Sequence, residues 1–425
     1  MCNAGLFTLL IFLFYRYTSF SLPKKYFFAG LGIKLLAGTT LGLVYHYYYH
    51  EGDTLSLFKD ATVLTRVAYQ APFDYLEMLF SNPFEKYPHV YEAIGNLDVR
   101  ALLMSKMISL ANLLTNNNYW LSNLYFSILS FWGIWYLCNK LIQLFSLDRS
   151  IVVISFLLYP SVFFWGSGII KESVLMGCLC FIVGYSLNLL YSPPQKPSRL
   201  SQVFDFLLFL FTLFIVFKLK YYYLAILLPT LMSLAISQKL INHHPRLEKY
   251  NILLFSSCFG LLVICASFSH PNLHFKVFFE VLVNNYYEML KQSPKLHNTI
   301  TYTGLQPNVL SIIQHAPQAM LEGLLRPYLW EEGNVLKKIA AVENLLFGGT
   351  FILAIIRVIV KKPKVSPKLQ LLIFATLVYS LLMLTLLSLA SPNLGNLVRY
   401  RVGFMPFLLL LILAILRLKK ELPGK

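Results

Sequence analysis

Residues 26–54 read YFFAGLGIKLLAGTTLGLVYHYYYHEGDT, an apolar stretch that ends in tyrosines and histidines and then in an acidic turn. Its apolar part, about 26–46, is long enough to cross a bilayer core of roughly 30 Å. Tyrosine rings gather where lipid headgroups meet water. The stretch therefore predicts a transmembrane helix that ends beside a carboxylate, Asp53, at the membrane surface.

The rest of the chain has the same character. Of its 425 residues, 57% are hydrophobic and 13% are charged, whereas soluble domains contain about 25% charged residues. We predict an all-α polytopic integral membrane protein. Its eleven transmembrane helices are expected at about 5–21, 26–46, 119–139, 150–165, 171–190, 203–217, 221–238, 251–269, 341–360, 369–390 and 401–417.

The first of these stretches, Gly5 to Leu22, has neither the basic start nor the small-residue cleavage site of a signal peptide, so we expect it to be retained. The six cysteines lie in or beside apolar stretches. This placement favours neither a disulfide framework nor a zinc site.

Basic residues fall in alternate loops, as the positive-inside rule requires. This pattern predicts a cytoplasmic C-terminus, an N-terminus outside, and a net charge of +17 that reflects topology and not binding of nucleic acid. We interpret residues 1–425 as a single membrane domain with two external loops, 47–118 and 270–340. The basic residues assigned to the cytoplasmic side are Lys24, Lys25, Lys140, Arg149, Lys196, Arg199, Lys239, Arg246, Lys249, Lys361, Lys362, Lys364, Lys368, Arg417, Lys419, Lys420 and Lys425.

Both external loops are expected to contain helices. Residues 100–114 form an amphipathic pattern that predicts a helix lying along the membrane surface. Its expected common face carries Leu102, Leu103, Met107, Leu110 and Leu114. In the second loop, helical pieces are expected around 276–290 and 308–325.

Unusual polar residues are concentrated on the predicted outer side. Carboxylates and cations gathered at one water–lipid boundary suit an anionic amphiphile such as a lipid-linked phosphate, and the planar fork of arginine binds phosphate through two parallel hydrogen bonds. The residues concerned are Asp53 and Asp60, Lys171 and Glu172 after the Trp165–Ile170 turn, Lys218 and Lys220, Arg326, and Arg399, Tyr400 and Arg401.

Simpler interpretations exist for several of these residues. Asp53 could cap the helix that follows it. His46 and His50, four residues apart, could bind a divalent metal with Asp53, although we expect no cofactor. Lys171 and Glu172 could pair only with each other. For the remaining groups, Lys218 and Lys220 could extend to the interface, and the arginine pair could be neutralised by Glu331 or Glu332.

At these residues the chain resembles bacterial membrane glycosyltransferases of the C-type fold (GT-C). The segment Glu51-Gly52-Asp53-Thr54 resembles the acid position of that family, with Asp53 as the match. Residues 160–172 resemble an external turn seen in several members, and Arg399-Tyr400-Arg401 followed by Pro406 resembles their late arginine–tyrosine motif. The resemblance implies a polyprenyl-phosphate sugar donor and a phosphate-binding arginine or lysine in later external loops.

The sequence thus predicts a glycosyltransferase that moves a sugar from a polyprenyl-phosphate lipid to a glycan or other acceptor. It would act at the outer face of the bacterial cytoplasmic membrane, in cell-surface glycan assembly. Asp53 would be the general base, and Arg399, Arg401, Arg326 and Lys171 would bind phosphate. Supporting roles are expected for Glu51, Asp60, Glu172, Tyr400, Lys218 and Lys220.

Three other functions are compatible with these features. The first is an O-antigen-type polysaccharide polymerase that acts on undecaprenyl-diphosphate-linked glycan. The second is a flippase or transporter of lipid-linked oligosaccharide, although such proteins usually have polar or broken spans at mid-membrane. The third is a non-catalytic membrane scaffold.

Overall fold

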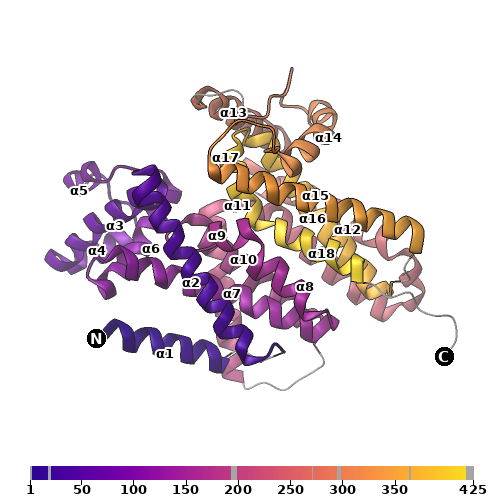
Figure 1. Cartoon of the computed structure of the whole chain (residues 1–425), viewed down its shortest axis with the longest axis horizontal. Helices are drawn as coiled ribbons and strands as arrows, with labels where there is room; N and C mark the ends of the chain where they lie inside the picture. The colour runs from indigo at the N-terminus through magenta and orange to yellow at the C-terminus, as the bar shows by residue number, and fades with distance from the viewer. Residues whose placement is uncertain are drawn as a thin grey trace. The chain divides into compact units, whose positions relative to one another are not determined.

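The computed structural model of the chain (Figure 1) describes residues 2–17, 21–192, 199–269, 271–293, 298–362 and 365–417. These residues form helices, turns and one isolated antiparallel bridge between Thr299 and Asn393, and they contain no strand. The all-helical class predicted from the sequence is confirmed. Seven of the described helices are long and apolar enough to cross a membrane, or eight if a bent pair near the C-terminus counts as one span.

Two compact units make up the chain. Unit 1 comprises residues 1–144, 162–188 and 192–221, and unit 2 comprises 145–161, 189–191 and 222–425. The first half of the chain contains α1 (Cys2–Tyr17), α2 (Lys24–Leu43), α3 (Asp53–Gln70), α4 (Pro72–Phe80), α5 (Pro88–Ala93), α6 (Val99–Thr115), α7 (Tyr119–Phe145), α8 (Arg149–Val153), α9 (Pro160–Trp165) and α10 (Lys171–Tyr191). The second half contains α11 (Arg199–His243), α12 (Asn251–Ser269), α13 (Phe275–Gln292), α14 (Val309–Leu325), α15 (Val335–Lys361), α16 (Pro367–Ala390), α17 (Leu394–Tyr400) and α18 (Met405–Arg417).

The seven apolar helices coincide with eight of the predicted spans, because α11 contains two of them. A straight helix of its 45 residues would be about 67 Å long, roughly twice the thickness of a bilayer core. The backbone of α11 leaves helical geometry at Lys220, between the two predicted spans. The sequence therefore located this break correctly.

The other three predicted spans differ from the observed helices. The helix at the first span, α1, has 16 residues, and residues 18–20 of that span lie outside the described part of the chain. The span at 150–165 is divided between a helical stretch at Arg149–Leu158 and α9. The last span belongs to a pair of helices, Leu394–Gly403 and Met405–Arg417, bent by 65°. A count of eleven spans stays a prediction.

Loops assigned to the cytoplasmic side meet within unit 2. The guanidinium of Arg417 lies 3.0 Å from the carboxylate of Asp148, and the ammonium of Lys368 lies 4.4 Å from the ring centre of Tyr191. The Asn251 side chain donates to Gln370 over 3.1 Å. The alternation of these loops across a membrane, and the side on which each lies, stay predictions. Lys196, Lys364, Lys419, Lys420 and Lys425 lie outside the described residues, and so does the side chain of Arg199.

The helices predicted in both long loops are present. Residues 47–118 form α3 to α6, which lie together in Figure 1, and α13 and α14 cover the two pieces predicted in 270–340. The five apolar residues of α6 do not share one environment, because Leu102 is buried whereas Leu110 and Leu114 are about half exposed. Instead, Ala101 and Met104 pack in the core shared with α3. The positions of the loops relative to the membrane stay predictions.

Close contact between α7 and α10 depends on two glycines. A Cβ atom placed on Gly133 would lie 2.0 Å from the carbonyl oxygen of Gly177, and one placed on Gly177 would lie 2.9 Å from the Cα of Ser130. Small residues are common where membrane helices approach this closely, because packing of backbone on backbone drives their association. The two glycines therefore set the distance between α7 and α10.

The variant Gly133→Ala is expected to unfold at a lower temperature than the wild type, since its methyl group would force α7 and α10 apart. Overpacking of this kind typically costs about 1–3 kcal/mol. Thermal unfolding of the purified protein in detergent would measure the loss. Gly260→Ala in α12 is the matched control, because no atom lies within 4 Å of its added Cβ. Equal midpoints for the two variants would contradict the proposed contact.

Candidate functional site

The chain approaches Asp53 through an unusual backbone. After α2, residues Val44–Tyr49 form a π-helical turn, His50 has a left-handed φ of 60°, and Gly52 has a φ of 120°. α3 then begins at Asp53, whose side chain is exposed. Gly52 holds the N-cap position, so Asp53 stands in the first helical turn instead. π-Helical turns and non-glycine residues with a positive φ, such as His50, are costly and cluster at functional sites, whereas glycine adopts a positive φ readily.

Packing on three neighbouring segments fixes this turn. The Thr54 hydroxyl lies 2.9 Å from the Tyr119 hydroxyl at the start of α7. Tyr45 is buried with Leu41 and Ile170, and Leu55 packs against this group. Ile170 immediately precedes Lys171. The start of α3 and the start of α10 therefore rest on one apolar cluster within unit 1.

Replacing Gly52 by alanine is expected to displace the start of α3 and to lower the midpoint of thermal unfolding. A Cβ at this position would lie 2.8 Å from the ring of Tyr45, at a φ that side chains rarely adopt. Such strain costs about 1–3 kcal/mol. Thermal unfolding of the purified protein in detergent would be measured, with Gly32→Ala, which has open space around its Cβ, as the control. An unchanged unfolding midpoint in Gly52→Ala would show that the turn tolerates a side chain.

The two charged residues at the start of α10, Lys171 and Glu172, have partners on other segments. The interpretation that they pair only with each other is therefore wrong. The Glu172 carboxylate lies 2.7 Å from the ammonium of Lys220, and both side chains are almost fully buried. The Lys171 ammonium lies 3.9 Å from Asp98 at the N-cap of α6, and its side chain is 22% exposed. Three segments predicted to share one side of the membrane thus meet in unit 1.

A polar stripe on α7 supports the turn before Lys171. Asn123 accepts a hydrogen bond from the Ile169 amide over 2.8 Å, Ser127 accepts one from the Gly168 amide, and Ser130 donates to the Gly166 carbonyl. These buried backbone groups need partners. This stripe was not predicted from the sequence, although its spacing of four and three residues inside an apolar helix was a visible signal.

Three further candidate residues of unit 1, Lys218, Asp60 and Glu51, differ from one another in burial. Lys218 is exposed, 5.8 Å from the ring centre of Phe214, as expected for a side chain that extends to the interface. Asp60 is buried and accepts a hydrogen bond from the Gly95 amide over 2.9 Å. Burial raises the pKa of the Asp60 carboxyl, although the backbone amides of Gly95 and Asn96 oppose the shift. Glu51 is exposed.

One buried cation, Lys34, was not predicted from the sequence to be a candidate site residue. Lys34 lies inside α2 with 2% of its surface exposed, and its ammonium has no hydrogen-bond partner within the described part of the chain. A Cβ placed on Gly166 would come within 2.9 Å of that nitrogen. A lysine in the middle of an apolar span is costly, and this cost was the signal that could have identified it.

In unit 2, Arg326 is held by protein carboxylates. Its Nε donates to Glu331 over 2.7 Å, and its Nη1 donates to Glu322 and to the Thr299 carbonyl. Burial lowers the pKa of Arg326, but the two carboxylates outweigh it and the pKa lies above its ordinary value. The sequence suggested that Glu331 could neutralise the Arg399–Arg401 pair. In the structure, Glu331 pairs with Arg326 instead.

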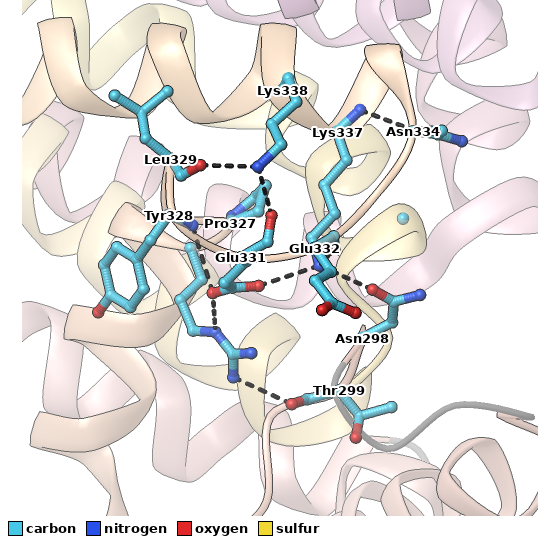
Figure 2. A network of polar contacts seen from close by, with 12 residues as sticks. Asn298, Thr299, Pro327, Tyr328, Leu329, Glu331, Glu332, Asn334, Lys337 and Lys338 are labelled. Carbon is cyan, nitrogen blue, oxygen red and sulfur yellow. Dashed lines mark hydrogen bonds and ion pairs between the residues drawn. The ribbon is translucent and has the colours of Figure 1, made fainter.

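Glu331 is the centre of this network (Figure 2). Its second carboxylate oxygen lies 3.1 Å from the Lys337 ammonium, which also donates to Asn298. Lys338 donates to the Leu329 and Glu331 carbonyls. Burial raises the pKa of the Glu331 carboxyl, but hydrogen bonds from Arg326 and Lys337 outweigh it, so the pKa lies below its ordinary value. The contacts favour a structural role for Arg326.

Arg401 is buried, with 3% of its surface exposed. Its guanidinium donates to the Asn344 side chain over 2.9 Å and to the Arg326 carbonyl. Arg399 is partly exposed and lies 5.4 Å from the ring centre of Tyr400. The Tyr400 carbonyl accepts a hydrogen bond from Tyr223 over 2.7 Å. Arg326 and Arg399 are thus both partly exposed, whereas Arg401 is buried.

Glu343 and Asn344 were also missed by the sequence analysis. Glu343 is 6% exposed and accepts hydrogen bonds from the amide and hydroxyl of Ser161. Ser161 follows a second π-helical turn, Ile154–Leu158. The sequence signal that could have identified them is their position at the start of the apolar run in α15. Polar side chains placed there usually have a buried hydrogen-bonding or ionic partner.

Among the residues that the structure describes, no three His, Cys, Asp or Glu side chains form a group that could hold a metal ion. Comparison of the chain with protein-family models, with curated proteins and with solved structures finds no match. The fold and the sites define a helical membrane protein with polar clusters at the ends of its apolar helices. Its function has to be argued from those clusters.

Proposed function

We propose that the protein is a membrane glycosyltransferase that uses a polyprenyl-phosphate sugar donor, and that its reacting groups lie at the start of α3 and α10 in unit 1. The observation that supports this proposal best is the unusual backbone conformation of the turn before Asp53. A π-helical turn and two positive-φ residues present an exposed carboxylate beside a predicted membrane boundary. A carboxylate needed only for solubility would not require such a backbone.

In the proposed reaction, an oxygen of the acceptor hydroxyl forms a bond with the anomeric carbon of the donor sugar. The bond between that carbon and the phosphate oxygen breaks, and polyprenyl phosphate leaves with the bonding electrons. Asp53 accepts the proton of the hydroxyl. The phosphate needs no proton to leave, because a nearby cation neutralises its charge.

Lys171 is the proposed cation in unit 1. Its partial exposure and the 3.9 Å separation from Asp98 are typical of a weak ion pair, which a phosphate can replace. Lys220 is less suited, since the short contact with Glu172 already neutralises it. In unit 2, Arg326 and Arg401 are held by other protein groups and contribute mainly to stability.

The direct test is turnover by the purified protein in liposomes. Polyprenyl-phosphate sugars would be supplied with a glycan acceptor, and released polyprenyl phosphate would be measured. Release that depends on the acceptor would support the proposal. If none of the donors is consumed while the protein elutes as a single folded species, the transferase proposal is wrong.

A further inference from the structure

α4 has an apolar outer side that no described element of unit 1 covers. Its sequence is PFDYLEMLF, and its exposed residues include Phe73, Leu76 and Phe80. The exposed fractions are 85% for Phe73, 48% for Leu76 and 89% for Phe80. The three positions are separated by three and four residues, so they form one stripe along the helix.

The opposite side of α4 is firmly packed. Tyr75 and Met78 are 4% and 0% exposed and belong to a core that also contains Leu64 of α3 and Leu102 of α6. The Tyr75 hydroxyl lies 2.9 Å from the hydroxyl of Ser109. The exposed stripe therefore belongs to a helix held in place by its own core.

The polar groups of α4 are also satisfied within unit 1. Lys106 of α6 donates to the Ser81 carbonyl and the Asn82 side chain, each over 2.7 Å, and so covers the C-terminal end of α4. Tyr87 donates to Asp74 and to Glu77, and Lys86 pairs with Glu77. With these groups occupied, the outward surface of α4 is mainly hydrophobic.

Both ends of the region are attached to apolar helices that are long enough to cross a membrane. The span Lys24–Tyr49 ends just before α3, and the span Tyr119–Phe145 begins just after α6. The two attachment points are neighbours, since Gly42 of α2 packs against Tyr119 and Trp120. In Figure 1, α3, α4 and α6 extend sideways from the end of α2 instead of continuing along its axis.

We propose that α4 is an interfacial helix, and that Phe73, Leu76 and Phe80 insert into the lipid leaflet at which α2 ends. Exposed aromatic and aliphatic residues on one side of a helix parallel to the bilayer bury themselves at the boundary of headgroups and acyl chains. Insertion of α4 would hold α3, and with it Asp53, against the membrane surface. This inference does not depend on the proposed transferase reaction.

The experiment is a spin-label measurement on the full chain in liposomes of phosphatidylcholine and phosphatidylglycerol. Phe73→Cys and Phe80→Cys would each be labelled in a background whose native cysteines are replaced. Collisions with oxygen, which concentrates in lipid, and with a water-soluble nickel chelate would be compared. Glu92→Cys on α5, an exposed charged position, is the matched control.

We expect oxygen collisions to exceed nickel collisions several-fold at positions 73 and 80, and the reverse at position 92. Nickel collisions at 73 and 80 equal to those at 92 would overturn the proposal, because the stripe would then face water. Low collision rates with both reagents would overturn it too, since a second protein surface would then cover the stripe. Elution of each variant as a single species would establish that the labels report on folded protein.

Discussion

A protein in which Asp53 is replaced by asparagine is expected to release polyprenyl phosphate roughly 10²- to 10⁴-fold more slowly than the wild type, the usual loss when a general base is removed. The amide has nearly the shape of the carboxylate but cannot accept the acceptor's proton. Asp53 is exposed in the first turn of α3. Asp53→Asn should lose about 0.3–1 kcal/mol of stabilisation by the helix dipole there, and elution of the variant as a single species would establish that it folds.

The matched control is Glu92→Gln, which removes another exposed carboxylate of unit 1 that has no assigned role in the reaction. We expect its rate to stay within a few-fold of the wild type. Equal rates for Asp53→Asn and the wild type would exclude Asp53 as the base. If Arg399→Ala abolishes turnover at the same time, the result favours the polymerase alternative, in which phosphate binding matters more than a specific carboxylate.

The sequence was sufficient to predict the helical membrane class and most helix positions, because long apolar runs leave the backbone few choices in lipid. It also located the break in α11 at Lys220, where two lysines and three tyrosines interrupt the run. Charged residues inside or beside apolar runs are costly enough to mark such breaks. For this reason, helix positions were predicted better than side-chain contacts.

The partners of the charged residues could not be predicted from the sequence. Glu172 pairs with Lys220, which is far along the chain, although Lys171 is its neighbour. Consecutive residues in a helix point in different directions, so adjacency was a poor guide. The π-helical turn before Asp53 likewise depends on the packing of Tyr45, and the tyrosine and histidine pattern alone does not specify it.

The second large effect is expected at the buried ion pair of unit 1. Lys220→Met should lower the free energy of unfolding by about 3–5 kcal/mol, the usual loss when one partner of a buried pair is removed. The reason is that the Glu172 carboxylate, 2% exposed, loses the ammonium 2.7 Å away. Glu172→Leu should be similarly harmful because it leaves the Lys220 ammonium without that carboxylate. Unfolding in detergent would be followed for both variants.

The double variant Lys220→Met with Glu172→Leu should recover most of the lost stability, since replacing a whole buried pair by apolar side chains is often nearly neutral. The double variant could instead lose the sum of the two single-variant decreases in the free energy of unfolding. In that case the residues are not coupled, and the observed contact does not stabilise the fold. The double variant also separates stability from function. A stable double variant that still transfers sugar would limit Lys220 to a structural role, whereas a stable but inactive one would assign the pair to the reacting site together with Lys171.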